Sequence, residues 1–149
     1  DEQENEEQEE LSLPNVTSQS QSINSLANHQ RKVFYNQCQN ILSQILKSEN
    51  SYFFFRPVDP EQDRAPDYFK IIVSPMSLYD VQQKIDKNQY ETPEEFIKDM
   101  RLIWHDAKQY NAPSHLIYKA ADVLSHKFEM LASTLPRFAR YRLQKKTHL

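Results

Sequence analysis

The chain has 149 residues, which is enough for one compact domain and little more. It carries 18 Lys and Arg against 21 Asp and Glu, and it contains no glycine. The lack of glycine argues against Gly-rich phosphate loops, dinucleotide-binding turns and nucleophile elbows, which need backbone conformations that glycine supplies. The single cysteine, Cys38, permits no internal disulfide and no Cys-based zinc cage, and it favours a reducing compartment and a core position. Apolar runs fall far short of the roughly 18 residues that span a bilayer, so we expect a soluble, intracellular protein. The sequence has no metal-ligand cluster and no phosphate loop, so we expect that it needs no metal or other cofactor.

Acidic side chains are concentrated at the start of the chain. Residues 1–10 hold seven of the 21 acids, and residues 12–30 are rich in Ser, Gln and Asn. Such a composition favours disorder, although an acidic interaction tail also fits the first ten residues. We therefore assign residues 1–27 to a segment without a fold of its own.

Four later stretches repeat apolar residues every three or four positions, which is the pattern of amphipathic helices. The first predicted helix runs from about Asn28 to Ser48. The second starts after Ser77, which forms a capping-box pattern with Asp80, and continues to about Asn88.

The third predicted helix has the clearest start signal. Thr92 offers an N-cap hydroxyl, and Pro93 occupies the first helical position, where its missing N–H costs nothing. Its apolar repeat, which includes Met100 and Trp104 as core residues, ends near Asn111. A fourth helix spans about residues 114–135. Four amphipathic helices without a convincing strand predict an all-α bundle.

The stretch between the first two helices, residues 50–76, lacks a helical period but is too apolar for disorder. Structureless connections longer than about 12 to 15 residues are uncommon in compact domains and are often functional. Four prolines lower the entropy that the loop loses on ordering. We expect a rigid, aromatic loop held against one end of the bundle, where it encloses a small pocket.

Four fragments in this region resemble the bromodomain signature in order and spacing. They are Pro57-Val58-Asp59, Pro66-Asp67-Tyr68-Phe69-Lys70-Ile71-Ile72, Ser74-Pro75-Met76 and Tyr110-Asn111-Ala112-Pro113. The resemblance covers about residues 31–135 and implies a left-handed four-helix bundle with a long ordered loop between the first and second helices. It places a bromodomain at residues 28–136 and leaves residues 137–149 as a basic C-terminal extension. The function it implies is non-catalytic, cofactor-independent binding of acetylated lysine on histone tails or other chromatin-associated proteins, by a monomeric domain in the nucleus.

The resemblance also assigns roles to residues. Asn111 matches the asparagine that donates a hydrogen bond to the acetyl carbonyl, and Tyr68 matches the tyrosine that reaches the same oxygen through water. The other implied pocket residues are Phe54, Pro57, Val58, Tyr110 and Ile117, with Tyr52, Phe53, Asp63, Ala65, Pro113 and His115 at the rim. The usual Trp-Pro-Phe shelf of the family is Tyr52-Phe53-Phe54 here, and Asp63 and Ala65 replace bulkier apolar residues of many members. These departures predict a shelf of different shape and a wider or more polar groove.

Simpler interpretations apply to the same residues. Asn111 also fits a helix C-cap in the left-handed conformation, and Tyr68 alone fits a core position. An enzyme would depend on His105, Asp106 and His115, but neighbours on one helix point in different directions, so we expect no catalytic residues. A bromodomain fold that no longer binds acetyl groups is a further alternative. The basic residues after the fourth helix fit either helix-dipole complements or a weak nucleic-acid contact.

Overall fold

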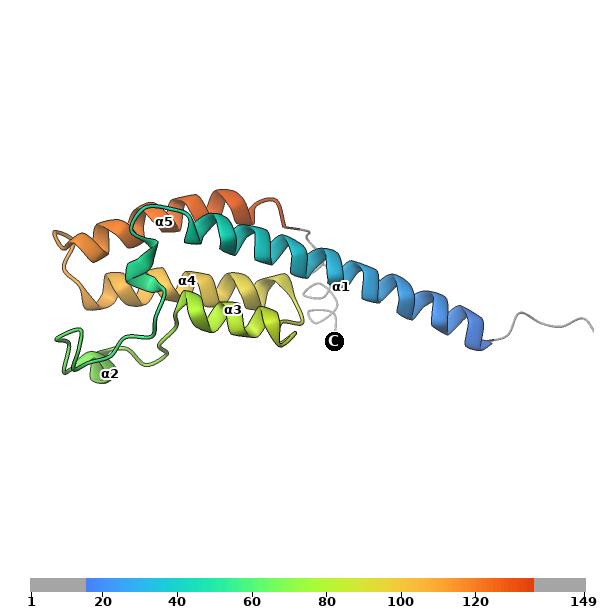
Figure 1. The fold of residues 1–149 in the computed structure, drawn as a ribbon, viewed down its shortest axis with the longest axis horizontal. Helices are drawn as coiled ribbons and strands as arrows, with labels where there is room; N and C mark the ends of the chain where they lie inside the picture. Colours follow the sequence, from blue (N-terminus) through green and yellow to red (C-terminus); the bar gives the residue numbers. More distant parts are fainter. Residues whose placement is uncertain (1–15, 136–149) are drawn as a thin grey trace, which may run out of the picture. The chain divides into compact units, whose positions relative to one another are not determined.

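The computed structural model describes residues 16–135 of the chain, and all regular structure in this range is helical. The long helices are α1 (Val16–Leu46), α3 (Leu78–Asp86), α4 (Pro93–Tyr110) and α5 (Leu116–Ala132). Two short elements, η1 (Ser51–Phe54) and α2 (Tyr68–Ile71), lie in the loop between α1 and α3. Figure 1 shows this order along the chain. The prediction of an all-α fold with four main helices is confirmed.

Contacts divide the chain into two units, one up to Val33 and one from Phe34 onward. In the first unit, helix begins at Val16, whereas we expected a start near Asn28 and disorder before it. No glycine or proline interrupts residues 16–33, and Ser, Gln and Asn each cost less than about 0.7 kcal/mol in a helix interior. Polar composition was therefore a poor guide to local structure in residues 16–27. The acidic residues 1–10 and the basic residues 137–149 lie outside the described residues, so their predicted roles and the domain boundaries stay predictions.

The second unit has its core where the apolar faces of the four long helices meet. Met100 and Trp104 are buried there as predicted, and Cys38 is fully buried. The other helical core residues are Phe34, Ile41, Leu42, Ile45, Leu78, Val81, Ile85, Phe96, Ile103, Ala107, Ala120, Ala121, Leu124 and Phe128. Within each helix these core residues recur every three or four positions, so the sequence periodicity identified the core faces correctly.

The predicted start signals of α3 and α4 have different outcomes. Ser77 and Asp80 form the predicted capping box, in which the Ser77 hydroxyl accepts from the Asp80 N–H at 3.2 Å and the Asp80 carboxylate accepts from the Ser77 N–H at 3.1 Å. Thr92 occupies the N-cap position of α4, but its hydroxyl makes no capping bond, so that part of the prediction was wrong. The Glu95 N–H donates instead to the Thr92 backbone carbonyl at 3.2 Å.

The loop between α1 and α3 is attached to the bundle at several points. The Ser51 hydroxyl donates to the Leu46 carbonyl at 2.8 Å, and the Tyr79 N–H donates to the Phe55 carbonyl at 2.9 Å. A second apolar cluster holds the far part of the loop and consists of Ala65, Tyr68 and Ile72, with Val58 and Tyr110 packed against it. The loop is therefore ordered, as its apolar and proline-rich sequence predicted.

Left-handed backbone occurs in this glycine-free chain at Asn50, Arg64 and Asn88, with φ angles of 64°, 54° and 53°. Asparagine tolerates this region because its short polar side chain can bond locally. Arg64 lacks that advantage, so its conformation costs of order 1–3 kcal/mol and persists only because the surrounding loop imposes it.

Candidate functional site

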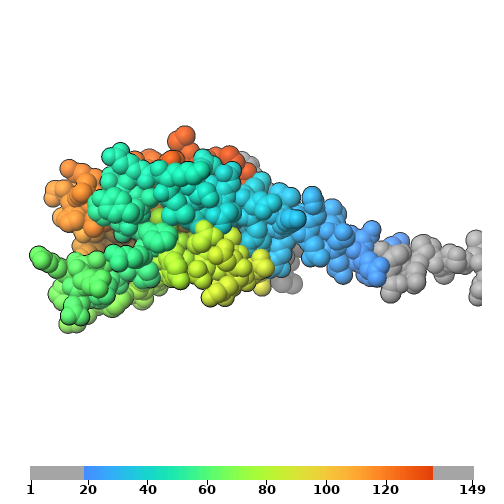
Figure 2. All heavy atoms as spheres, viewed as in Figure 1, coloured from blue at the N-terminus to red at the C-terminus, as the bar shows by residue number. Residues whose placement is uncertain are grey.

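A cavity of about 870 Å³ lies between the loop and the adjoining ends of α4 and α5. In Figure 2 the surface is hollowed where the green atoms of the loop approach the orange atoms at the start of α5. The structure brings together at this cavity every site residue predicted from the sequence except Pro113, which is exposed outside it. These residues are Tyr52, Phe53, Phe54, Pro57, Val58, Asp63, Ala65, Tyr68, Tyr110, Asn111, His115 and Ile117.

Further lining residues were not predicted. Ile103 and Ala107 precede Asn111 by two turns and one turn of α4, so helical spacing could have placed them beneath it. Others come from the loop and the start of α3 and carry no periodic signal in the sequence. They are Phe55, Arg56, Asp59, Gln62, Arg64, Met76 and Tyr79.

Asn111 is the C-cap of α4 and projects a half-buried side chain at the cavity. Its backbone is extended (φ −100°, ψ 146°), so the left-handed C-cap conformation considered above is not adopted. The backbone N–H and the side-chain Nδ2 both donate to the Ala107 carbonyl, at 3.1 and 2.9 Å. Because an amide nitrogen carries two hydrogens, this bond fixes the side chain and leaves one N–H for another acceptor.

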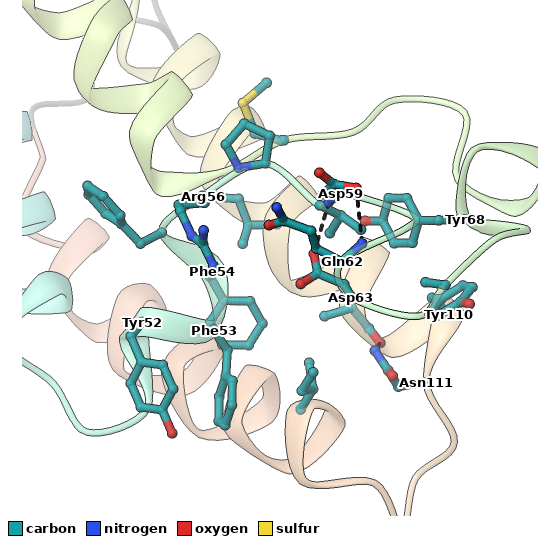
Figure 3. A pocket seen from close by; sticks show the side chains of 18 of the residues that line it. Tyr52, Phe53, Phe54, Arg56, Asp59, Gln62, Asp63, Tyr68, Tyr110 and Asn111 are labelled. Carbon is teal, nitrogen blue, oxygen red and sulfur yellow. Dashed lines mark hydrogen bonds between the residues drawn. The ribbon is translucent and has the colours of Figure 1, made fainter.

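One wall of the cavity is aromatic (Figure 3). Phe54 is buried and meets Trp104 edge to face, with ring centroids 5.3 Å apart, so the core holds its position. Tyr52 and Phe53 lie 4.3 Å apart between centroids, and Tyr52 is 68% exposed. The wall is therefore anchored at Phe54 and open to solvent at Tyr52.

Tyr68 and Tyr110 form part of the opposite wall, with ring centroids 5.0 Å apart (Figure 3). The Tyr110 hydroxyl donates to the Asp67 carboxylate at 2.8 Å and so ties α4 to the loop. Burial raises the pKa of Tyr68 to about 12, with smaller contributions from Asp106 and Tyr110. Tyr68 therefore keeps its proton at neutral pH, and its hydroxyl makes no hydrogen bond to residues 16–135.

The outer edge of the loop is held by an acidic turn, shown by the dashed lines in Figure 3. The Asp59 carboxylate accepts from the Glu61 and Gln62 N–H groups at 3.0 and 3.2 Å. The Asp63 carboxylate accepts from the Asp59 N–H at 2.9 Å. These bonds give the rim a fixed shape, with Arg64 in its left-handed conformation at the end of the turn.

His115 is the N-cap of α5 and an exposed residue of the cavity rim. Its Nδ1 accepts from the Ile117 N–H at 3.0 Å, so the neutral ring carries its proton on Nε2. Ile117 is half-buried and lines the same part of the cavity. The side chain of His115 thus has a structural role in starting the helix that carries Ile117.

His105 and Asp106 lie outside the cavity lining. Their side chains approach to 3.7 Å, closer than we expected for sequence neighbours on one helix, although His105 is exposed and Asp106 is buried. Burial raises the pKa of the Asp106 carboxyl, and the nearby His105 partly offsets this. Within residues 16–135 no group of three or more His, Cys, Asp or Glu side chains could hold a metal ion, and no helix there is long and apolar enough to cross a membrane.

Comparison with known proteins identifies the family. The family model described as Bromodomain matches residues 38–123. The chain is 36% identical over 101 residues to transcription factor GTE11 of Arabidopsis thaliana, covering 68% of this chain and 16% of that protein. It is 34% identical over 104 residues to the SWR1 complex bromodomain subunit bdf1 of Schizosaccharomyces pombe, covering 68% and 18%. An ankyrin repeat, bromo and BTB domain-containing protein of Dictyostelium discoideum is 38% identical over 92 residues, covering 62% and 11%.

The chain thus spans less than a fifth of the length of each of these relatives. The matched region contains the last turns of α1 from Cys38 to Leu46, the loop, α3, α4 and the first half of α5. It therefore includes every residue found at the cavity. On the family match and the helical fold together, this chain belongs to the bromodomain family.

Proposed function

We propose that this domain binds acetylated lysine side chains of histones or other chromatin-associated proteins. The observation that carries the proposal is the Asn111 amide, which the Ala107 carbonyl fixes beside an aromatic-lined cavity with one N–H left to donate. An acetyl carbonyl is an acceptor of the right kind for that N–H.

The site can discriminate between acetylated and unmodified lysine by charge. Acetylation replaces a strongly hydrated ammonium with a neutral amide that carries a carbonyl acceptor. Unmodified lysine brings only donors, so it offers Asn111 no acceptor and would lose hydration in a largely apolar cavity. A single hydrogen bond contributes only about 1 kcal/mol net. We therefore expect weak binding of a single mark, with tighter binding where several marks or linked domains act together.

Other lining residues have supporting roles in this proposal. The Tyr68 hydroxyl, which has no partner within the described residues, is available to hold a water that bridges to the acetyl oxygen. Phe54, Val58 and Ile117 provide apolar walls. The exposed Tyr52 and the half-buried Phe53 replace the usual shelf in the cavity wall, where they contact the peptide that carries the acetylated lysine.

The names of the relatives support a chromatin setting. One is a transcription factor and another is a subunit of the SWR1 complex. We accordingly propose a nuclear location, a monomeric domain and binding without catalysis or cofactor. We also propose a weak nucleic-acid contact through residues 137–149, which their basic sequence supports.

The alternative is a bromodomain scaffold whose altered shelf no longer supports binding. Calorimetric titration of the domain with an acetylated histone-type peptide and its unmodified counterpart separates the two. We expect binding of the acetylated peptide only, with amide resonances of Val58, Asn111 and Ile117 shifted. Equal behaviour of the two peptides would contradict the reader function and favour the scaffold.

Asn111→Ala tests the central contact. It removes the proposed donor to the acetyl oxygen, at a cost of about 1 to 3 kcal/mol, so affinity should fall roughly tenfold to a hundredfold. Asn36→Ala is the matched control, because Asn36 is exposed on α1. An Asn111→Ala protein with unchanged affinity would show that this amide does not bind the ligand.

A further inference from the structure

Two buried aspartates lie on the same flank of α4, about two turns apart, in contrasting surroundings. Asp99 has two partners, because its Oδ2 accepts from the Lys84 ammonium at 2.8 Å and from the Tyr90 hydroxyl at 2.7 Å. Asp106 has no comparable partners. Its Oδ2 is buried and makes no hydrogen bond to residues 16–135.

The only charged neighbour of Asp106 in that range gives it little support. His105 Nδ1 lies 3.7 Å from Asp106 Oδ1, which is too long for a hydrogen bond. The His105 side chain is 71% exposed, whereas that of Asp106 is 6% exposed. Water therefore screens most of the attraction that a protonated His105 could offer. The charged form of Asp106 is disfavoured by the loss of hydration on burial.

Helical spacing puts Asp106 on the side of α4 that faces the part of the loop carrying Tyr68. Tyr110 follows Asp106 by one turn, so the two side chains leave the same face of α4. The Tyr110 ring packs on Tyr68, and the charge of Asp106 contributes to the raised pKa of that tyrosine. Residues 65–72 are fixed over this face by the Gln109 side chain, which donates to the Ile71 carbonyl at 3.4 Å, and by the apolar cluster around Tyr68.

We propose that Asp106 is a positioning residue for Tyr68: uncharged, it lets residues 65–72 dock firmly on α4, and charged, it loosens that docking. The physical reason is that a buried carboxylate without partners can be relieved in two ways. It either takes up a proton, or the segment above it opens and admits water. Opening displaces Tyr68 from the cavity, so the consequence for acetyl-lysine binding rests on the function proposed above.

The inference predicts a pH dependence with a definite sign. Burial raises the pKa of Asp106 above its usual value of 3.8, and the raised pKa means that the docked state favours the protonated form. Firm docking is therefore present at low pH and lost as pH rises through the pKa of the docked state. In the described residues the titratable groups around Asp106 are His105 beside it, Tyr68 on the loop and, by helical spacing, Tyr110 one turn further along α4. The nearby Asp67 carboxylate is engaged by the Tyr110 hydroxyl.

Asp106→Asn is the direct test, because asparagine keeps the shape and removes the charge. The first readout is amide hydrogen exchange at Tyr68 and Ile72, whose N–H groups donate to the Ala65 and Tyr68 carbonyls within the segment. Because asparagine has no charge that opening of the segment could relieve, we expect protection of these two amides at pH 7 to be higher in the variant than in the unmodified protein. The protection of the variant should also lack the pH dependence that we expect of the unmodified protein.

Two further variants provide controls. Asp99→Asn removes a carboxylate that Lys84 and Tyr90 satisfy, so it should lower the melting temperature without altering the pH profile of the segment. His105→Gln removes the group that lowers the pKa of Asp106, so the loss of docking should move to higher pH. If Asp106 had only a structural role, His105→Gln would not shift the pH profile of segment protection. Asp106→Asn would not abolish the pH dependence of that protection either.

The second readout is affinity for an acetylated peptide as a function of pH. It should decline with rising pH in the unmodified protein and stay flatter in Asp106→Asn. A failure of the peptide to bind at any pH would overturn the proposed function, while hydrogen exchange would still decide the role of Asp106. If Asp106→Asn destabilises the domain as Asp99→Asn does, or leaves segment protection unchanged, the inference about Asp106 is wrong.

Discussion

Leu124→Ala separates the stability of the bundle from recognition at the cavity. Leu124 is 1% exposed on α5, in the core shared by the four long helices, and it does not line the cavity. The substitution removes three carbons, which corresponds to about 2.4 kcal/mol of lost transfer free energy at about 0.8 kcal/mol per group. The void that remains brings the expected loss to about 2 to 5 kcal/mol. At roughly 3 to 4 °C per kcal/mol for a domain of this size, that loss lowers the melting temperature by about 6 to 20 °C.

Thermal melts followed by circular dichroism measure this loss, and calorimetric titration well below the transition measures binding by the folded protein. Val123→Ala is the matched control, because Val123 is the preceding residue of α5 and is 67% exposed. Its effect should lie within about 0.5 kcal/mol. The assignment of the α5 core face would be refuted if the two variants melted at the same temperature, and the separation of core from cavity would be refuted if Leu124→Ala abolished binding while still folded.

Two further predictions concern hydrogen bonds seen in the structure. Tyr90→Phe removes the buried hydroxyl that donates to Asp99, so the free energy of unfolding in urea should fall by about 1 to 3 kcal/mol; an unchanged value would mean that Lys84 alone satisfies the carboxylate. Ser77→Ala breaks the capping box of α3 and should cost about 0.5 to 2 kcal/mol, whereas Thr92→Ala should cost clearly less because Thr92 makes no capping bond. Equal losses for the two hydroxyl residues in the same urea experiment would contradict the conclusion that only Ser77 caps its helix with its side chain.

The sequence predicted the fold well where the relevant physics is local. Apolar residues at helical spacing identified the core faces of all four long helices, including the buried positions of Met100 and Trp104. Local competition between acceptors was harder to foresee. Ser77 and Thr92 look alike in sequence, yet only Ser77 uses its hydroxyl as a cap, because the Thr92 carbonyl takes the N–H of Glu95.

The cavity was predicted less completely, because its lining depends on how distant segments meet. The signature fragments led to Asn111 and Tyr68, both of which line it. Arg56 and Gln62 also line it, but they come from a loop whose path follows from tertiary contacts and not from any repeat. The sequence also could not predict that Asp106 Oδ2 is buried without a hydrogen bond to residues 16–135, because it does not reveal which face of α4 the loop covers.

The Ala107 carbonyl, which accepts from both the backbone N–H and the side chain of Asn111, also determines which end of the Asn111 amide faces the cavity. An asparagine side chain can in principle rotate by half a turn and exchange its oxygen for its nitrogen. Here the Ala107 carbonyl can only accept, so a rotated Asn111 would place oxygen against oxygen. The helix thus locks the side chain in a single polarity before any ligand arrives, and the rotational freedom that a mobile amide would surrender on binding has already been given up during folding. A visiting group therefore meets a permanent donor, and the last turn of α4 decides which chemistry the cavity accepts.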